Sequence, residues 1–343
     1  MPDALDVDAV VAALRDDWDF DVDVADYAAV GGGSYHWQVT GTAGARGFVT
    51  VDDLDQKAWL GDGRDVVFDG LHRAFDTAVA LRDGGLSFVV APVATPDGES
   101  LRRIDERYVI ALFPLVEGES AEFGHFEGED EARLDVVALL AELHAASALA
   151  EGLPGTSGLD LPGRRHLEAA LEERNEPWSG GPLSEVARNA VKSSAAELVE
   201  LLGLADRLAA EAKAHGGRFV VTHGEPHAGN VMRTREGRVL VDWDTVALAP
   251  PERDLWMLVG AGTAAADLYA RATGRTLDPI ALDYFRLTWD LKDLAEYLKL
   301  LRSPHQENDD TRRACQALVN CAAIREERAT SEAARRSRAL RRA

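Results

Sequence analysis

Residues 220–230 read Val-Val-Thr-His-Gly-Glu-Pro-His-Ala-Gly-Asn, and residues 238–244 read Arg-Val-Leu-Val-Asp-Trp-Asp. In each stretch, a short apolar run that is typical of a buried strand ends in side chains with oxygen atoms. Glu225 and Asn230 follow the first run, and Asp242 follows the second. Phosphoryl transfer from a nucleotide needs such a set, because one carboxylate faces the acceptor hydroxyl while other oxygens hold Mg²⁺. The two stretches therefore favour a phosphotransferase site.

Either stretch alone would also fit an ordinary turn or a polar strand end. In this order and spacing they resemble the catalytic and metal-binding loops of the aminoglycoside phosphotransferase family, and the chain looks most like its spectinomycin-phosphotransferase branch. The resemblance extends to three further segments. Residues 108–118 look like the hinge, and residues 139–146 look like the first helix of the C-lobe. Residues 250–255 look like the segment whose Asp braces the catalytic loop. It implies an α+β, two-lobe, protein-kinase-like fold, with a small antiparallel-sheet N-lobe and a larger, mostly helical C-lobe.

The pattern along the chain fits two lobes, an N-lobe over residues 1–116 and a C-lobe over residues 117–343. In the first we expect two helices and a set of strands: helices at 8–17 and 69–82, a hairpin over 26–40, and strands at 47–51, 86–93 and 107–112. In the second we expect mainly helices: 129–150, 183–215 with a break or bend near Gly203, 254–273 and 279–301.

The resemblance implies a nucleotide site for ATP or GTP in the N-lobe. Glycines at a hairpin tip let backbone amides approach phosphates, so Gly31, Gly32, Gly33 and Ser34 are expected to cover them, although a plain hairpin turn would look the same. The hinge resemblance places Ala111, Leu112 and Phe113 at the adenine.

In the C-lobe, the resemblance gives Glu225 the task of orienting and deprotonating the acceptor. Asn230 and Asp242 would hold Mg²⁺, with Asp244 as a weaker ligand. His223 is expected to brace the loop through backbone hydrogen bonds.

Two positions depart from the family pattern. The family carries Asp where this chain has Glu225, and a phosphate-binding Lys where it has Thr50. Lys57 and Arg46 are the candidates to replace that cation. In the family, an acid of the helix at 69–82 pairs with the strand lysine. No such acid is evident here, and Asp76 is the nearest one. With Thr at position 50, the pair itself would have no purpose.

The acceptor is expected to contact the helix at 279–301. Asp290, Asp293 and Glu296 recur at three-residue steps and so share one side of it. This face could bind the ammonium or hydroxyl groups of a sugar antibiotic, and a solvated helix face has the same pattern.

The amino-acid composition limits the kinds of molecule that the chain is expected to bind. The 343 residues carry a formal net charge of −22, which argues against nucleic acid and would suit a polycationic acceptor or simply a soluble protein. A basic tail follows from about residue 325. No apolar stretch is long enough to span a membrane. Cys315 and Cys321 do not suggest a disulfide, so we expect a cytoplasmic protein, monomeric or weakly dimeric.

The sequence thus predicts a Mg-dependent kinase that phosphorylates a hydroxyl of a small, antibiotic-like or aminocyclitol molecule. Two alternatives stay open. One is a nucleotide-binding pseudokinase that acts as a sensor, because Glu225 and Thr50 depart from the family. The other is a kinase for a housekeeping small molecule such as choline or a sugar.

Overall fold

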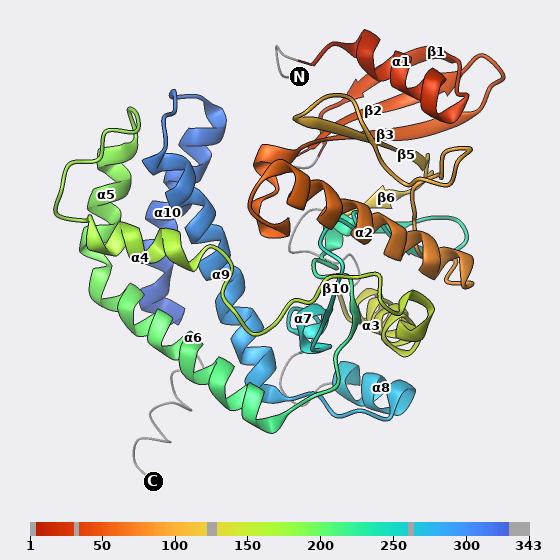
Figure 1. The fold of residues 1–343 in the computed structure, drawn as a ribbon. Coiled ribbons are helices and arrows are strands. Elements are labelled where there is room, and N and C mark those ends of the chain that lie inside the picture. The colour runs from red at the N-terminus through yellow and green to blue at the C-terminus, as the bar shows by residue number, and fades with distance from the viewer. Residues whose placement is uncertain (1–4, 31–33, 122–128, 260–263, 329–343) are drawn as a thin grey trace. The chain divides into compact units, whose positions relative to one another are not determined.

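The computed structural model describes residues 5–30, 34–121, 129–259 and 264–328 (Figure 1). The chain divides into two compact units, and each is described by itself. The first unit comprises Met1–Gly158 and Arg218–Leu277, and the second comprises Leu159–Gly217 and Asp278–Ala343. The division into lobes between residues 116 and 117 stays a prediction.

The first unit contains a five-stranded antiparallel sheet in the order β1-β2-β3-β5-β4 (Figure 1). Its strands are β1 (Val22–Ala28), β2 (Ser34–Gly41), β3 (Arg46–Asp53), β4 (Arg102–Arg103) and β5 (Tyr108–Pro114). β1 and β2 form the expected hairpin, and its Gly31–Gly33 tip lies outside the described residues. Thr50 of β3 lies opposite His36 of β2 and Ala111 of β5. Because directly opposed residues point to the same side of a sheet, these three side chains share one face.

Helices α1 (Val7–Trp18) and α2 (Arg64–Asp83) cover opposite faces of this sheet (Figure 1). α1 buries Leu14 among the strand residues of one face. α2 buries Phe75 against the other face, beside Ala111. The sheet is therefore buried on both sides, and α2 covers the face that carries Thr50.

Between β3 and α2, the chain makes two short 3-10 turns, η1 (Leu54–Gln56) and η2 (Ala58–Leu60). The side chain of Asp53 caps η1 by accepting the amide of Asp55. Lys57 lies between the two turns and is only 2% exposed. A lysine is almost never buried to this degree unless it is paired.

The two stretches quoted first form loops between four short strands of the same unit. β7 (Val220–Thr222) pairs with β10 (Ala247–Ala249). β8 (Val231–Arg233) and β9 (Arg238–Leu240) form a hairpin that β6 (Glu119–Ser120) extends. The helical segments of this part are α3 (Glu129–Ala145), η3 (Ser147–Ala150), η4 (Ala228–Asn230), α7 (Glu252–Leu255) and α8 (Ala264–Thr273).

The strand predicted over residues 86–93 is wrong. Val89 forms only an isolated bridge with Leu240, and the amide of Val93 donates to the carbonyl of Leu112. Most of this run is buried, so its apolar character reflects burial of a connecting segment. A short apolar run does not by itself distinguish the two cases.

The second unit is helical, with α4 (Arg164–Glu172), α5 (Ser184–Ser193), α6 (Ala195–His215), α9 (Pro279–Arg302) and α10 (Asp309–Arg328). Apolar side chains from all five helices form its main core. The break predicted near Gly203 lies instead at Ser194, whose φ of −106° and ψ of 12° leave the helical region. Gly203 continues inside α6, because a single glycine only weakens a helix.

A small antiparallel sheet and a mainly helical remainder confirm the predicted α+β class. Among the described helices, none has both the length and the apolar composition that crossing a membrane requires. The basic tail beyond residue 328 lies outside the described residues.

Candidate active site

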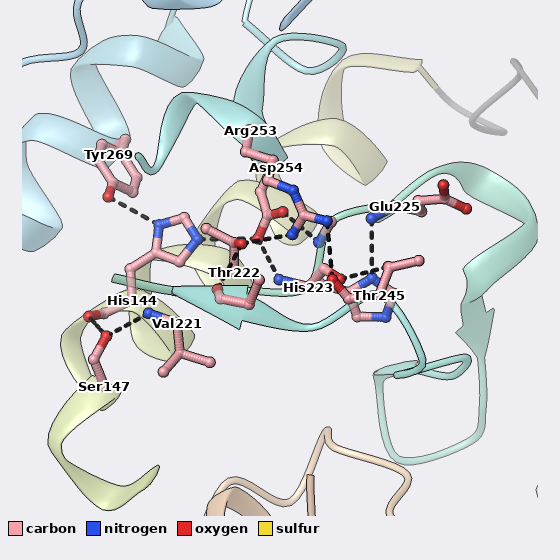
Figure 2. A network of polar contacts seen from close by, with 12 residues as sticks. His144, Ser147, Val221, Thr222, His223, Glu225, Thr245, Arg253, Asp254 and Tyr269 are labelled. Carbon is pink, nitrogen blue, oxygen red and sulfur yellow. Dashed lines mark hydrogen bonds and ion pairs between the residues drawn. The ribbon is translucent and has the colours of Figure 1, made fainter. Parts of the chain in front are cut away.

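The loop after β7 is held by one buried carboxylate, that of Asp254 in α7 (Figure 2). Asp254 Oδ2 accepts the amide of His223 at 2.8 Å, and Oδ1 accepts the amide of Gly224 at 2.7 Å. Burial alone would raise the pKa of Asp254, but the hydrogen bond from His144 and nearby positive charge hold it below its ordinary value. These contacts confirm the expectation that an Asp of residues 250–255 braces the loop.

The same carboxylate connects the loop to two helices. His144 Nε2 in α3 lies 3.1 Å from Asp254 Oδ2, and His144 Nδ1 lies 2.9 Å from the hydroxyl of Tyr269 in α8. On the other side, Arg253 donates to the Thr222 hydroxyl and to the carbonyl of Thr245. Figure 2 shows Asp254 at the centre of this set, which we call the brace and define as His144, Thr222, Arg253, Asp254 and Tyr269.

Gly224 is required by the brace for two reasons. Its φ is 100°, which side chains other than glycine rarely adopt. A Cβ atom there would also lie 2.5 Å from the Arg253 guanidinium. Position 224 therefore has to be glycine for Arg253 to reach the loop.

His223 braces its loop through backbone hydrogen bonds, as predicted, and one of them also connects the two quoted stretches. Its Nε2 lies 2.9 Å from the carbonyl of Val241, and its Nδ1 accepts the amide of Glu225 at 3.3 Å. Burial lowers the pKa of His223. A neutral ring with its proton on Nε2 satisfies both contacts, so His223 sets the spacing between the Glu225 loop and the turn that carries Asp242.

Asn230 is the last residue of η4, and its side chain turns toward Glu225. Its Nδ2 donates to the Glu225 carbonyl at 3.0 Å, which leaves Oδ1 as a neutral oxygen ligand. The side chain of Glu225 is half-buried and points away from Asp254 (Figure 2). The loop thus presents the carboxylate of Glu225 on the side that the brace does not use (Figure 2).

Asp242 begins the Asp-Trp-Asp turn with a φ of 65°. Non-glycine residues seldom occupy this region, and such strain concentrates at functional sites. The Asp242 side chain is accessible to solvent, although many atoms of the surrounding chain lie close to it. The resulting desolvation, followed by repulsion from Asp244, raises the pKa of Asp242 well above the ordinary value. The positive charge of Lys57 opposes this rise.

Of the two candidate cations, Lys57 and Arg46, Lys57 is the one that lies among buried carboxylates. Its Nζ lies 2.6 Å from Asp244 Oδ2 and 2.9 Å from Asp52 Oδ1. Burial by itself would lower the pKa of Lys57, but the carboxylates of Asp244, Asp52 and Asp242 hold it above the ordinary value. Arg46 instead forms an exposed ion pair with Glu117.

Thr50 makes a different contact from the family lysine it replaces. Its Oγ1 lies 3.3 Å from His36 Nδ1, and the His36 ring stacks on Phe48. Asp52, two residues further along β3, points to the same face and reaches Lys57. Lys57 thus places a buried ammonium group in the turn that follows the strand carrying Thr50.

The other expected nucleotide residues are distributed along the same sheet. Ser34 donates to Asp52 Oδ1 at 2.5 Å. Ala111 and Leu112 are buried in β5 and Phe113 is half-buried, and the carbonyl of Leu112 already accepts the amide of Val93. An adenine role for these three residues stays a prediction.

The expected acceptor residues lie on α9 of the second unit. Asp290 and Asp293 are half-buried, and Glu296 is exposed with Oε2 3.7 Å from Lys299 Nζ. Their contact with an acceptor stays a prediction.

A divalent cation fits the residues around Lys57. The three carboxylates of Asp52, Asp242 and Asp244 act on one ammonium group, so negative charge is in excess. In the described part of the chain, no cluster of three or more His, Cys, Asp or Glu residues could hold a metal ion alone. Mg²⁺ commonly uses one or two carboxylates and completes its shell with water and substrate phosphates, which suits Asp242 and Asn230.

The comparisons with known proteins agree with this geometry. The model of the phosphotransferase enzyme family matches residues 38–319. Protein StrN of Streptomyces griseus is 30% identical over 260 residues, which cover 74% of this chain and 76% of StrN.

Two solved structures share the fold. A spectinomycin phosphotransferase, in complex with ADP and spectinomycin, has a TM-score of 0.69 at 17% identity, covering 93% of this chain and 98% of its own. An amicoumacin kinase, in complex with AMP-PNP, Ca²⁺ and its antibiotic, has a TM-score of 0.54 at 12% identity, covering 92% and 94%. These likenesses confirm the predicted kinase-like fold. The chain therefore belongs to the phosphotransferase enzyme family, to which its resemblance to the aminoglycoside phosphotransferases pointed.

Proposed function

We propose that the chain transfers the γ-phosphoryl group of ATP or GTP to a hydroxyl of a small antibiotic-like or aminocyclitol molecule. The observation that carries the proposal is the buried Lys57, whose ammonium group lies 2.6 Å from Asp244 and 2.9 Å from Asp52. A buried cation among carboxylates, beside a braced loop that presents Glu225 and Asn230, matches the needs of phosphoryl transfer.

Lys57 is proposed to bind the nucleotide phosphates. The ammonium group of Lys57 donates a hydrogen bond to Asp244 and forms an ion pair with Asp52. An ammonium group has three donors, so the proposal assigns a further donor to a phosphate oxygen. Because Ser34 lies at the start of β2 and reaches the same Asp52 carboxylate, the glycine-rich turn before it would cover the phosphates from the sheet side.

Asn230 and Asp242 are proposed to hold Mg²⁺, with Asp244 as a weaker ligand. When bound, the ion would neutralise charge on the phosphates. The carboxylates of Asp52, Asp242 and Asp244 around the single ammonium group of Lys57 support this assignment, because an excess of negative charge favours a bound cation.

Glu225 is proposed to act on the acceptor. Its carboxylate would accept the hydroxyl proton as the acceptor oxygen forms its bond to the γ-phosphorus. The bond from that phosphorus to the β–γ bridging oxygen breaks, and the nucleoside diphosphate leaves. Pro226 fixes the backbone directly after Glu225, which helps to hold a side chain one methylene longer than the family's Asp.

An antibiotic-like acceptor is supported by the relatives and by charge. Two proteins of the same fold act on spectinomycin and amicoumacin, as their names state. A net charge of −22 would attract a cationic acceptor. The Asp290, Asp293 and Glu296 face of α9 is the proposed contact. Since the donor is a cellular nucleotide, the proposal places the reaction in the cytoplasm.

Acceptor-dependent ADP formation tests the proposal. Wild-type protein with Mg-ATP is incubated with a panel of aminocyclitols, aminoglycosides, nucleoside and peptide antibiotics, choline, ethanolamine and simple sugars. We expect ADP formation with an aminocyclitol or related antibiotic, and its loss in Glu225→Gln. Turnover with choline or a sugar alone would instead establish the housekeeping alternative. Nucleotide binding without any turnover would favour the sensor.

A further inference from the structure

We infer that Asp52 is the positioning residue for the phosphate-binding Lys57, in the place of a carboxylate supplied by helix α2. The inference rests on the proposed function and deepens it. In this arrangement, the end of β3 and the turn that follows it help to set the position of the ammonium group, because Asp52 and Lys57 both belong to the β3–η2 segment.

The geometry of Asp52 is that of a buried, dedicated partner. Asp52 is 1% exposed. Its Oδ1 receives the Ser34 hydroxyl at 2.5 Å and lies 2.9 Å from Lys57 Nζ. Its Oδ2 is buried and makes no hydrogen bond to any described residue. A buried carboxylate with an oxygen that lacks a hydrogen bond is costly, and the ion pair with Lys57 offsets part of that cost.

Two acids of α2, Asp65 and Asp76, have other partners. Asp65 pairs with Arg103, and Asp76 accepts the hydroxyl of Ser100 at 2.7 Å. Within the described residues, Lys57 forms ion pairs only with Asp52 and Asp244. No contact between Lys57 and α2 is therefore needed to fix the ammonium group.

The register of the sheet explains how the Asp52 carboxylate is held in place. Asp52 lies opposite Ser34 on β2 and opposite Val109 on β5. It is thus held from both sides by a hydrogen-bonded ladder, at the end of β2 where the glycine-rich turn ends.

Asp52→Asn is the test, since it keeps the shape and a hydrogen-bond acceptor for Ser34 but removes the charge. Affinities for ADP and for adenosine are measured by calorimetry in wild type, Asp52→Asn and the α2 control Asp76→Asn. We expect the ADP affinity of Asp52→Asn to fall at least tenfold while its adenosine affinity changes less than threefold. Asp76→Asn should bind both ligands as wild type does. The ratio of the two affinities separates positioning from a general loss of structure.

Should Asp52→Asn fail to fold, Asp52→Glu keeps the charge and displaces it by one methylene, and the same selective loss of ADP affinity is expected. Equal losses for ADP and adenosine, or a selective loss in Asp76→Asn, would overturn the inference. Wild-type ADP binding with an unchanged ratio in Asp52→Asn would overturn it and leave the proposed function standing. Absence of ADP binding by the wild type would overturn both.

Discussion

The two sides of the Glu225 loop differ in how their charges are balanced. On the brace side, Asp254 accepts two backbone amides and contacts His144, with Arg253 adjacent (Figure 2). On the other side, Asp52, Asp242 and Asp244 share the single ammonium group of Lys57. The pKa of Asp254 is lowered, whereas that of Asp242 is raised.

This contrast separates structural from ligand-dependent acids. A buried carboxylate whose hydrogen bonds are complete within the chain stabilises the fold. A carboxylate that is repelled by neighbouring carboxylates is stabilised when a cation binds beside it. We therefore expect substitutions in the brace to reduce the stability of the protein without ligand, and substitutions around Lys57 to reduce its response to Mg-nucleotide.

Glu225→Gln is expected to have the largest effect, because Glu225 belongs to neither group and is the residue proposed to take the proton of the acceptor hydroxyl. The amide cannot take a proton, and general-base contributions are typically about 10²–10⁴-fold. We expect kcat to fall within that range on the acceptor that the panel identifies, with unchanged thermal stability and nucleotide affinity. Equal kcat for wild type and variant would show that another residue takes the proton.

Asp254→Asn tests the brace. Removing one partner from a buried charged network typically costs about 3–5 kcal/mol, and urea unfolding of the protein without ligand should show a loss of this order. Because the folded pKa of Asp254 is lowered, its contribution is present above the unfolded value of about 3.9. It is lost as pH falls through the folded pKa. The difference between wild type and variant should therefore shrink only below about pH 4.

If Asp254→Asn leaves the unfolding free energy unchanged, the brace is not a stability element. A selective loss of ADP affinity in a fully stable Asp254→Asn protein would also remove the distinction between the two sides.

Tyr269→Phe is the smallest perturbation, since it removes only the hydroxyl that lies 2.9 Å from His144. A hydrogen bond of this kind contributes about 1 kcal/mol. We expect a loss of that size in the unfolding free energy and no change in ADP affinity. A larger effect on kcat than on stability would indicate that the outer part of the brace also positions Glu225.

The sequence predicts most of the elements that carry the site. The residues 220–230 and 238–244 predict the loop and the turn, and the brace by an Asp of residues 250–255 is confirmed by the contacts of Asp254. Local order and spacing are sufficient here, because the interacting groups follow short strands in sequence. The roles of the residues at the proposed catalytic and metal positions stay predictions.

The remaining features depend on contacts between distant segments. The sequence does not show which of Lys57 and Arg46 lies among carboxylates, because Asp244, which contacts Lys57, is 187 residues away. His144 and Tyr269 carry no sequence signal beyond their place on helices, and their partnership joins α3 to α8. The helix break fell at Ser194 rather than Gly203 because packing, more than glycine content, decided where the helices end.

Thermal unfolding in the presence of Mg-ADP tests the central claim most directly. Ligand at about 100 times its Kd should stabilise the native state by roughly 2.7 kcal/mol. We predict a rise in the Tm of the wild type with Mg-ADP, a smaller rise with ADP and a chelator, and loss of the magnesium-dependent part in Asp242→Asn. In Asp254→Asn the rise should persist from a lower starting Tm. A wild-type Tm that does not change across millimolar Mg-ADP would contradict the account.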